Sequence, residues 1–180
     1  MSGQHFPHGS VVLVDEQDTP IGTMPKLQAH QEGRLHRAFS VFVLNDEGEL
    51  LLQRRSAFKY HSPGLWTNTC CSHPWPGEAT RDAAVRRLQE EMGFRCALEQ
   101  AFSFVYRADV GQGLIEHELD HVFIGHYTGP VVPDPAEVAG TCWMHLDELH
   151  ASLRSEPHRY TAWLPICWDR FREHMRTLAR

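Results

Sequence analysis

The chain has 180 residues, of which 42% are hydrophobic and 22% are charged, and its formal net charge is −6. This size and composition suit one soluble globular domain over residues 1–180. The acidic balance argues against nucleic acid or an anionic membrane as a partner, and no apolar run approaches the roughly 20 residues that would allow membrane insertion. The first ten residues, MSGQHFPHGS, lack a signal peptide's features, so we expect a cytoplasmic protein whose first few residues are flexible.

Strands are expected to come first along the chain. Apolar runs bounded by turn residues predict strands at residues 10–14, 38–44, 49–53, 101–107 and 114–125. The second and third of these strands are expected to form a hairpin around the turn at residues 45–48. Their number and order favour a mixed sheet.

Helices are expected after the hairpin and at the end of the chain. Residues 79–92 predict a helix, because Ala84 and Leu88 continue a four-residue apolar repeat and Gly93 follows as a stop. The tail over residues 145–179 is expected to be helical. This pattern predicts an α/β fold, with a mixed β-sheet core flanked by helices.

Two adjacent cysteines stand in the segment WTNTCCSHP. The chain holds five cysteines, an odd number that argues against a disulfide framework, and a bridge between neighbours would be strained. In an extended segment Cys70 and Cys71 face opposite ways, and Cys71 shares its side with His73. We expect Cys71 to lie in a functional site and Cys70 to pack into the core.

Glu116 and Glu118 lie two apart in a predicted strand, so they share one face. Two carboxylates on one face repel unless a cation lies between them or water screens them. A solvated face is the ordinary reading, but it would turn His117 and His121 inward. The alternative reading, which we favour, is a metal site or a carboxylate placed for proton transfer.

Three histidines could join these glutamates. A single histidine in such a position is more often a surface residue than a metal ligand, and this holds for each of His30, His36 and His73. Together with two carboxylates they would form a mixed nitrogen and oxygen site that suits Mn²⁺, Zn²⁺ or Fe²⁺. Spacing alone does not establish that the five residues converge.

The predicted helix matches most of the nudix signature. Ser72 stands where the first Gly belongs, and Arg87 replaces a Glu that normally helps to hold catalytic cations, which argues against diphosphate hydrolysis. Arg87 and Glu91 share one helix face, so both could meet a phosphate, or they could form an ordinary ion pair. The positions in register are Glu78, Arg86, Leu88, Glu90, Glu91, Gly93 and Phe94.

Taken together, these segments resemble the type 1 isopentenyl-diphosphate isomerases, which have a nudix-like fold. The resemblance rests on HQEGRLHRAFSVFV, LLLQRRSAFKYHSPGLWTNTCCSHP, FVYRA, GLIEHELDHVF, the altered helix and Trp163. It implies an isomerase of isoprenoid biosynthesis that interconverts isopentenyl and dimethylallyl diphosphate, adding a proton at C4 and removing one from C2. The alternatives are a nudix hydrolase of nucleoside diphosphate derivatives and a zinc-stabilised binding module, although structural zinc favours Cys-rich ligation.

The resemblance also implies ligands for two metals and for the substrate. One Mn²⁺ or Zn²⁺ would be held by His30, His36, His73, Glu116 and Glu118. A Mg²⁺ on Glu91 and the backbone carbonyl of Cys71 would bridge to the substrate diphosphate. The diphosphate would contact Lys26, Arg55, Lys59 and Arg87. No flavin or nucleotide cofactor is expected, the partner is a small-molecule diphosphate, and the chain is expected to be a monomer or weak homodimer.

The chemistry implied by the resemblance needs an acid and a base on opposite sides of a dry cavity, because protonating an alkene gives a tertiary carbocation. Glu118, acting through Tyr106, is the expected acid. Cys71 as a thiolate is the expected base, with its pKa lowered by a nearby cation. The roles swap in the reverse reaction, and Trp163 is expected to cover the carbocation with its π face.

Overall fold

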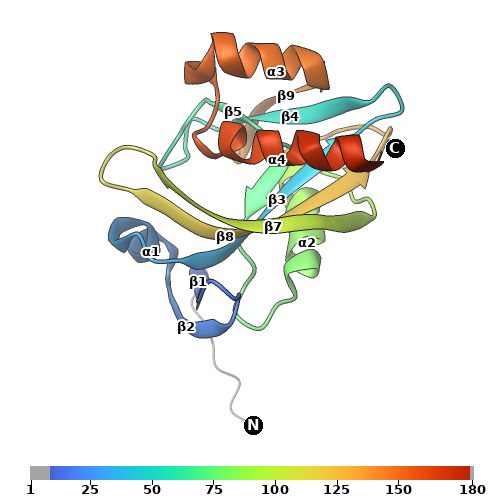
Figure 1. The fold of residues 1–180 in the computed structure, drawn as a ribbon. Helices are drawn as coiled ribbons and strands as arrows, with labels where there is room; N and C mark the ends of the chain where they lie inside the picture. The colour runs from blue at the N-terminus through green and yellow to red at the C-terminus, as the bar shows by residue number, and fades with distance from the viewer. Residues whose placement is uncertain (1–8, 179–180) are drawn as a thin grey trace.

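The computed structural model describes residues 9–178, and it contains one nine-stranded mixed sheet with helices on both faces (Figure 1). The helical segments are α1 (Lys26–Glu32), α2 (Thr80–Met92), α3 (Leu146–Ser155), a 3-10 turn (Pro157–Arg159) and α4 (Trp163–Leu178). The strands are β1 (Ser10–Val14), β2 (Pro20–Pro25), β3 (His36–Leu44), β4 (Glu49–Arg55), β5 (Trp66–Thr67), β6 (Cys70–Ser72), β7 (Leu98–Asp109), β8 (Ile115–His126) and β9 (Val138–His145).

β3 is the central strand of the sheet. It pairs with β1, β4, β6 and β8, and its pairing with β8 is parallel. That parallel ladder begins where His36 stands opposite Glu118. The sheet therefore brings two candidate metal ligands side by side from segments far apart in the sequence.

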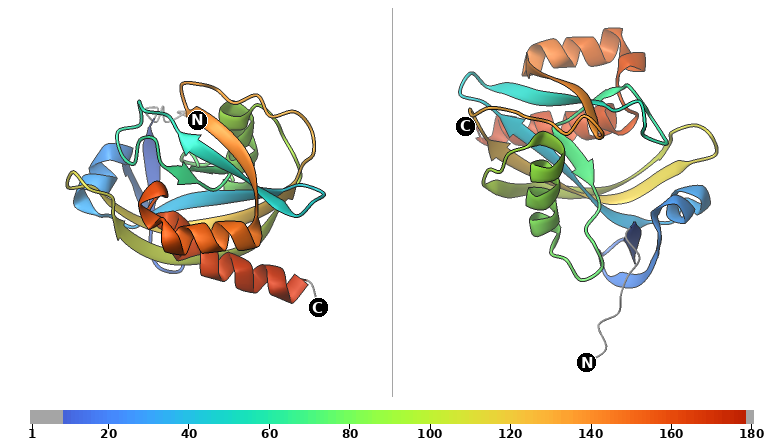
Figure 2. Two further views of the ribbon diagram at one scale, coloured as in Figure 1. Left: turned by 90° about the horizontal axis from the view of Figure 1, so that it is seen from above. Right: turned by 180° about the vertical axis from the view of Figure 1, so that it is seen from behind.

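The alternation of side chains along β3 and β4 builds two separate cores. Val41 and Leu51 belong to the core beneath α2, whereas Phe42, Leu50 and Leu52 belong to the core beneath α3 and α4. Figure 1 shows α4 in front of the sheet, and the right-hand view of Figure 2 shows α2 in front of the opposite face. The predicted α/β class is confirmed.

All five predicted strands are present, and the predicted hairpin is confirmed, although its pairing is short. β3 and β4 are registered only at Leu44 and Leu50, next to the turn, and then separate. Beyond the turn, β4 pairs with β9 and β5. The strands diverge because β6 and β8 occupy the two edges of β3.

The helical tail predicted over residues 145–179 is divided. β9 ends at His145, α3 ends at Ser155, and a short turn precedes α4. The helix α3 stops before Glu156, which precedes Pro157 and has a non-helical backbone with φ of −135° and ψ of 51°. The short elements β2, α1, β5, β6 and β9 were not predicted.

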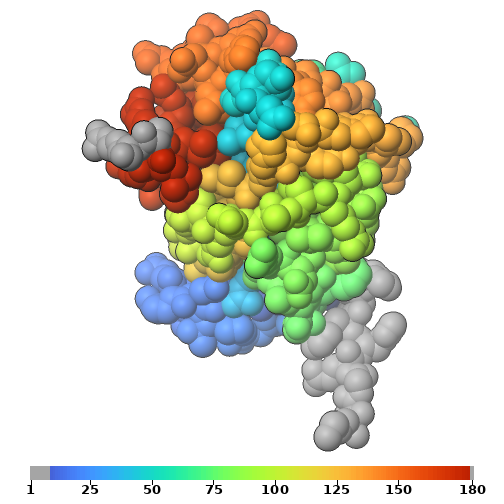
Figure 3. Space-filling model, turned by 90° about the vertical axis from the view of Figure 1, so that its right-hand side faces the viewer, coloured from blue at the N-terminus to red at the C-terminus, as the bar shows by residue number. Residues whose placement is uncertain are grey.

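The C-terminal end of α2 is fixed by a glycine. Gly93 has φ of 78°, a left-handed conformation, and a Cβ added there would lie 2.1 Å from the carbonyl oxygen of Val132. The Val132 backbone N–H donates to the Met92 carbonyl at 3.2 Å. Figure 3 shows the segment that contains Val132 lying directly against the end of α2.

Within residues 9–178, no helix is both long and apolar enough to cross a bilayer. The expected flexibility of the first few residues concerns positions that lie outside the described part of the chain.

Candidate active site

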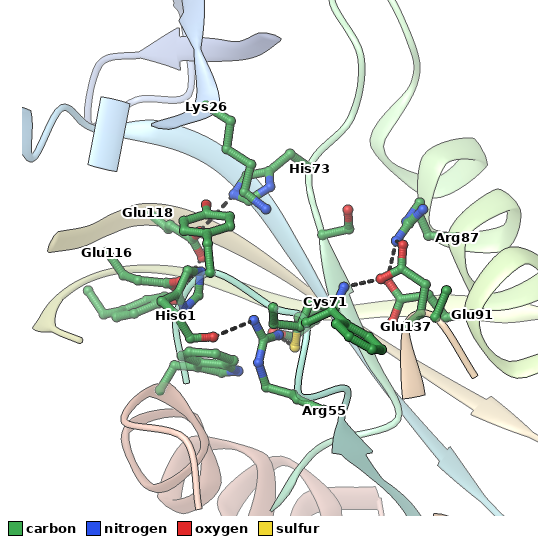
Figure 4. Close-up of a pocket in the computed structure, with 18 residues that line it drawn as sticks. Lys26, Arg55, His61, Cys71, His73, Arg87, Glu91, Glu116, Glu118 and Glu137 are labelled. Carbon is green, nitrogen blue, oxygen red and sulfur yellow. Dashed lines mark hydrogen bonds and ion pairs between the residues drawn. The ribbon is translucent and has the colours of Figure 1, made fainter. Parts of the chain in front are cut away.

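A cavity of about 330 Å³ opens beside β3, β6 and β8, and it is lined by every predicted site residue except His30 and His36. These two histidines are fully buried next to it. Figure 4 shows two charged clusters on opposite sides of Cys71. One holds Glu116, Glu118 and His73, and the other holds Arg87, Glu91 and Glu137.

The first cluster has the geometry of a metal site. One ligand atom from each of His30, His36, His73 and Glu118 lies within 4.8 Å of the other three. Glu118 Oε1 is 2.8 Å from His73 Nε2 and 3.4 Å from His36 Nε2. The structure therefore brings together four of the five residues that we predicted to bind one metal.

The outer nitrogens of two histidines already have partners. The Nδ1 of His36 lies 2.8 Å from the Arg34 carbonyl, and the Nδ1 of His30 lies 2.8 Å from the Tyr60 hydroxyl. The Nε2 of His30 is buried and finds no hydrogen-bond partner among the described residues. A buried orphan acceptor that points into a group of ligand atoms fits a divalent metal.

The protonation states fit a cation as well. Burial lowers the pKa of His30 to about 2 and that of His73 to about 4, so both imidazoles are neutral near pH 7. Burial alone would raise the pKa of Glu118, but hydrogen bonds with His36 and His73 hold it well below its ordinary value. Neutral imidazoles and an ionised carboxylate are the forms that bind metal.

Glu116 stands beside this group rather than inside it. Its Oε2 is 2.7 Å from the Tyr106 hydroxyl, which is also 2.7 Å from Glu118 Oε2. Burial, followed by the charge of Glu118, raises the pKa of Glu116 to about 8. A protonated Glu116 can donate a hydrogen bond to the Tyr106 hydroxyl oxygen. The Tyr106 hydroxyl has one proton, so it then donates its own hydrogen bond to Glu118. Both glutamates are buried, which excludes the solvated-face interpretation of this strand.

The two cysteines face opposite cores, as predicted. Cys70 is fully buried beneath α2, and Cys71 lines the cavity. The Cys71 thiol donates to Asn68 Oδ1 at 3.0 Å, and its Sγ lies 3.6 Å from Ser40 Oγ. The expected lowering of the Cys71 pKa is not found: burial, with the charge of Asp120, raises it to about 12. In this structure Cys71 is a thiol.

The second cluster contains cations paired with internal carboxylates. Arg87 contacts Glu91 and, at 3.3 Å, Glu137, and Lys59 also pairs with Glu137. Burial alone would lower the pKa of Arg87, but these carboxylates raise it, so the guanidinium stays charged. Glu91 also accepts a hydrogen bond from Gln53 at 3.0 Å.

Arg55 occupies the floor of the cavity. It donates to the carbonyls of His61 at 3.1 Å and Ser62 at 3.2 Å, and its guanidinium lies 5.2 Å from the centre of the Trp163 ring. Lys26 lies at the opposite wall, with its Nζ 5.6 Å from the Tyr60 ring centre. The predicted diphosphate contacts thus surround one space.

Sequence reasoning missed several cavity residues. His61 and Glu137 lie in loops with no periodic pattern, and Glu137 reaches the site only because β9 pairs with β4. Ser40 lines the cavity and donates a hydrogen bond of 2.8 Å to Asp120, which lies outside the lining; both are buried polar residues inside strands. Their signal was a polar side chain within an apolar strand.

Comparison with known proteins agrees with the fold. The NUDIX domain family matches residues 34–164. The chain is also similar to a structure titled as DR0079 from Deinococcus radiodurans, with a TM-score of 0.74, 21% identity and coverage of 89% of this chain and 98% of that one. A MutT protein from Methanosarcina mazei Go1 gives a TM-score of 0.64 at 20% identity, covering 77% and 94% of the two chains. These likenesses show the fold.

Relatives of higher identity narrow the class. Isopentenyl-diphosphate Delta-isomerase 2 of Aromatoleum aromaticum is 55% identical, covering 89% of this chain and 85% of its own length. Isopentenyl-diphosphate Delta-isomerase of Pectobacterium atrosepticum is 48% identical, covering 94% of each chain.

The fold and the His/Glu cluster therefore define a metal-using enzyme of the NUDIX fold. Within that class, the chain belongs to the isopentenyl-diphosphate Delta-isomerase family.

Proposed function

We propose that this chain is an isomerase that interconverts isopentenyl diphosphate and dimethylallyl diphosphate in isoprenoid biosynthesis. One observation carries the proposal: a single cavity holds a half-buried thiol, Cys71, between a metal-type His/Glu cluster and a cluster that contains Arg87. The names of the relatives supply the substrate. The chain would act as a single domain, in the cytoplasm, as a monomer or weak homodimer.

The metals are assigned by ligand type. A Mn²⁺ or Zn²⁺ would be held by His30, His36, His73, Glu118 and, after a small shift of its carboxylate, Glu116. A Mg²⁺ would be held by Glu91 and the Cys71 carbonyl. When bound, these ions would neutralise the charge of the carboxylates and of the diphosphate.

Substrate anchoring would rest on the cations around the cavity. Arg55 and Lys26 have no carboxylate within ion-pair distance among the described residues and can turn to the diphosphate directly. Lys59 and Arg87 would exchange Glu137 for the more highly charged diphosphate. Fixing that end places the short hydrocarbon chain between Cys71 and Glu118.

Two proton transfers complete the reaction. The electron pair of the double bond takes a proton to form a C–H bond at C4, and a C–H bond at C2 breaks to form the new double bond. Cys71 begins as a thiol and Glu118 as a carboxylate, so from these states Cys71 donates a proton and Glu118 accepts one through Tyr106. The assignment expected from the sequence, with Glu118 as acid and Cys71 as base, then describes the opposite direction.

The carbocation between these steps needs a dry and electron-rich wall. Trp163 is 4% exposed and lines the cavity. Its ring already has the Arg55 guanidinium at 5.2 Å. We propose that the same ring stabilises the carbocation by a cation–π contact.

The competing function is nudix hydrolysis of nucleoside diphosphate derivatives. The purified enzyme, with Mg²⁺ and Mn²⁺, is to be given isopentenyl diphosphate in one reaction and ADP-ribose in another. We expect an acid-labile allylic diphosphate from the first and no release of AMP from the second. Rapid AMP release without isomerisation would favour the hydrolase.

A further inference from the structure

His61 is a further buried histidine at the cavity, and no metal or substrate role has been assigned to it above. It lies in the loop between β4 and β5 and is 4% exposed. Its Nε2 is 3.3 Å from Glu116 Oε1, and its Nδ1 is 3.5 Å from Ser62 Oγ. Its backbone carbonyl accepts a hydrogen bond from Arg55 Nη2 at 3.1 Å, drawn in Figure 4.

We propose that His61 is a positioning residue: its imidazole orients the Glu116 carboxyl group toward the metal site, while its backbone carbonyl holds Arg55 for the diphosphate. The second half rests on the proposed function, because it takes the diphosphate as the substrate. The loop then connects the two ends of the cavity through one residue.

The hydrogen bonds of Glu116 show why His61 is needed. Glu116 Oε2 is taken by Tyr106, and Oε1 meets His61. Glu116 is 5% exposed, so water cannot easily replace a lost partner. With both oxygens held, the carboxyl plane is fixed beside Glu118. With only Tyr106 left, the group could rotate.

The geometry also selects the tautomer of His61. Its Nε2 must carry the proton in order to donate to Glu116, and its Nδ1 then accepts from the Ser62 hydroxyl. Hydrogen-bond partners around a metal site commonly control affinity, and their loss typically costs about 10- to 100-fold. The same loss is expected here if Glu116 is a ligand that His61 orients.

Two amide substitutions separate orientation from bulk. In His61→Gln the side-chain NH₂ group reaches the position of Nε2, whereas in His61→Asn it reaches only that of Nδ1. Both variants keep the backbone carbonyl that Arg55 uses. Mn²⁺ is titrated into metal-free protein, and free Mn²⁺ is followed by its paramagnetic resonance signal.

We expect the Kd for Mn²⁺ to rise about 10-fold in His61→Asn and less than about 3-fold in His61→Gln. In isomerase assays at saturating metal, kcat should fall in His61→Asn. KM should stay within about 2-fold, because Arg55 is held by the backbone carbonyl of residue 61, which the substitution keeps. Equal Kd values for wild type and His61→Asn, or equal losses in both variants, would overturn the proposal.

A measurement on the wild type covers the case in which a variant does not fold. The His61 tautomer is read from ¹⁵N chemical shifts of the zinc-loaded protein. A proton on Nε2 supports the proposal, and a proton on Nδ1 overturns it. A wild-type enzyme that binds Mn²⁺ but does not isomerise would refute the proposed function, while the titration alone would still decide the role of His61 toward the metal.

Discussion

Cys70 and Cys71 are neighbours in the sequence, and the strand places them in different environments. Cys71→Ala removes a proton-transfer group, so we expect turnover to fall about 10²- to 10⁴-fold, with metal content and thermal midpoint unchanged. Cys70→Val only enlarges a core side chain, at a cost of about 1–3 kcal/mol, and should keep turning over. Steady-state assays and thermal melts of both variants are the measurement. An inactive Cys70→Val beside an active Cys71→Ala would reverse the assignment.

At the residue scale, the sequence predicted those parts of the site that follow from alternation. Glu116 and Glu118 on one face, and Cys71 and His73 on one side, need only an extended backbone. His61 could not be found in this way, because it lies in a loop. The pKa of Cys71 was expected to fall beside a cation, whereas in metal-free protein it is raised, because its burial and the nearby Asp120 are properties of the folded chain.

At the scale of elements, α2 carries one cation into the cavity and keeps another out of it. Arg87 lines the cavity, whereas the neighbouring Arg86 pairs with Glu78 at 2.7 Å and stacks on Trp75. Arg87→Ala should raise KM about 10- to 100-fold through the loss of a charge-assisted bond to the diphosphate. Arg86→Ala is the control, and its KM should stay near the wild-type value. Equal KM values for the two variants would contradict the account.

The end of α2 gives a test of stability. Gly93→Ala meets both a left-handed φ and the Val132 carbonyl, so we expect a loss of at least about 2 kcal/mol in the free energy of unfolding. Gly48→Ala has a similar φ of 74° and no atom within 4 Å of the added Cβ, so it should lose only about 1 kcal/mol. Urea midpoints measure both losses. If Gly93→Ala is no less stable than Gly48→Ala, the backbone at Val132 moves away from the added Cβ at little cost in free energy.

The elements were predicted better than their pairing. Apolar runs marked the strands at 38–44 and 49–53, but a turn between two strands does not say how far they stay paired. The sequence of β9, VAGTCWMH, did not lead us to predict a strand. The helix α2 was predicted correctly, because its sequence has an apolar repeat of helical period, a terminal glycine and a match to the nudix signature.

At the scale of the whole molecule, a sheet between two helical layers buries opposing titratable groups in one cavity. In metal-free protein the pKa values of His30, His61 and His73 are lowered from 6.5 to between about 2 and about 4. Below pH 6.5 the unfolded chain binds protons that the folded chain refuses, so stability falls as the pH falls.

The carboxyl groups act in the other direction. The pKa values of Glu116 and Asp120 are raised from 4.5 and 3.8 to about 8, so from about pH 4.5 to 8 the folded chain holds protons that the unfolded chain has released. Below pH 6.5 the three histidines outweigh these two carboxyl groups, and above pH 6.5 the carboxyl groups dominate. Stability then falls as the pH rises, by up to about 1.4 kcal/mol per proton and pH unit. The metal-free protein should be most stable near pH 6.5, as measured by urea midpoints. A midpoint that still climbs between pH 6.5 and 8 in wild type would contradict these protonation states.

The central claim is that the cavity adds a proton to C4 and removes one from C2 of the same diphosphate. The most direct measurement is NMR of isopentenyl diphosphate incubated in D₂O with the metal-loaded enzyme. We expect dimethylallyl diphosphate with deuterium first in the methyl group formed from C4, then at C2 as the reaction reverses, and an intact diphosphate throughout. Release of phosphate, or dimethylallyl diphosphate that forms without deuterium, would contradict the account.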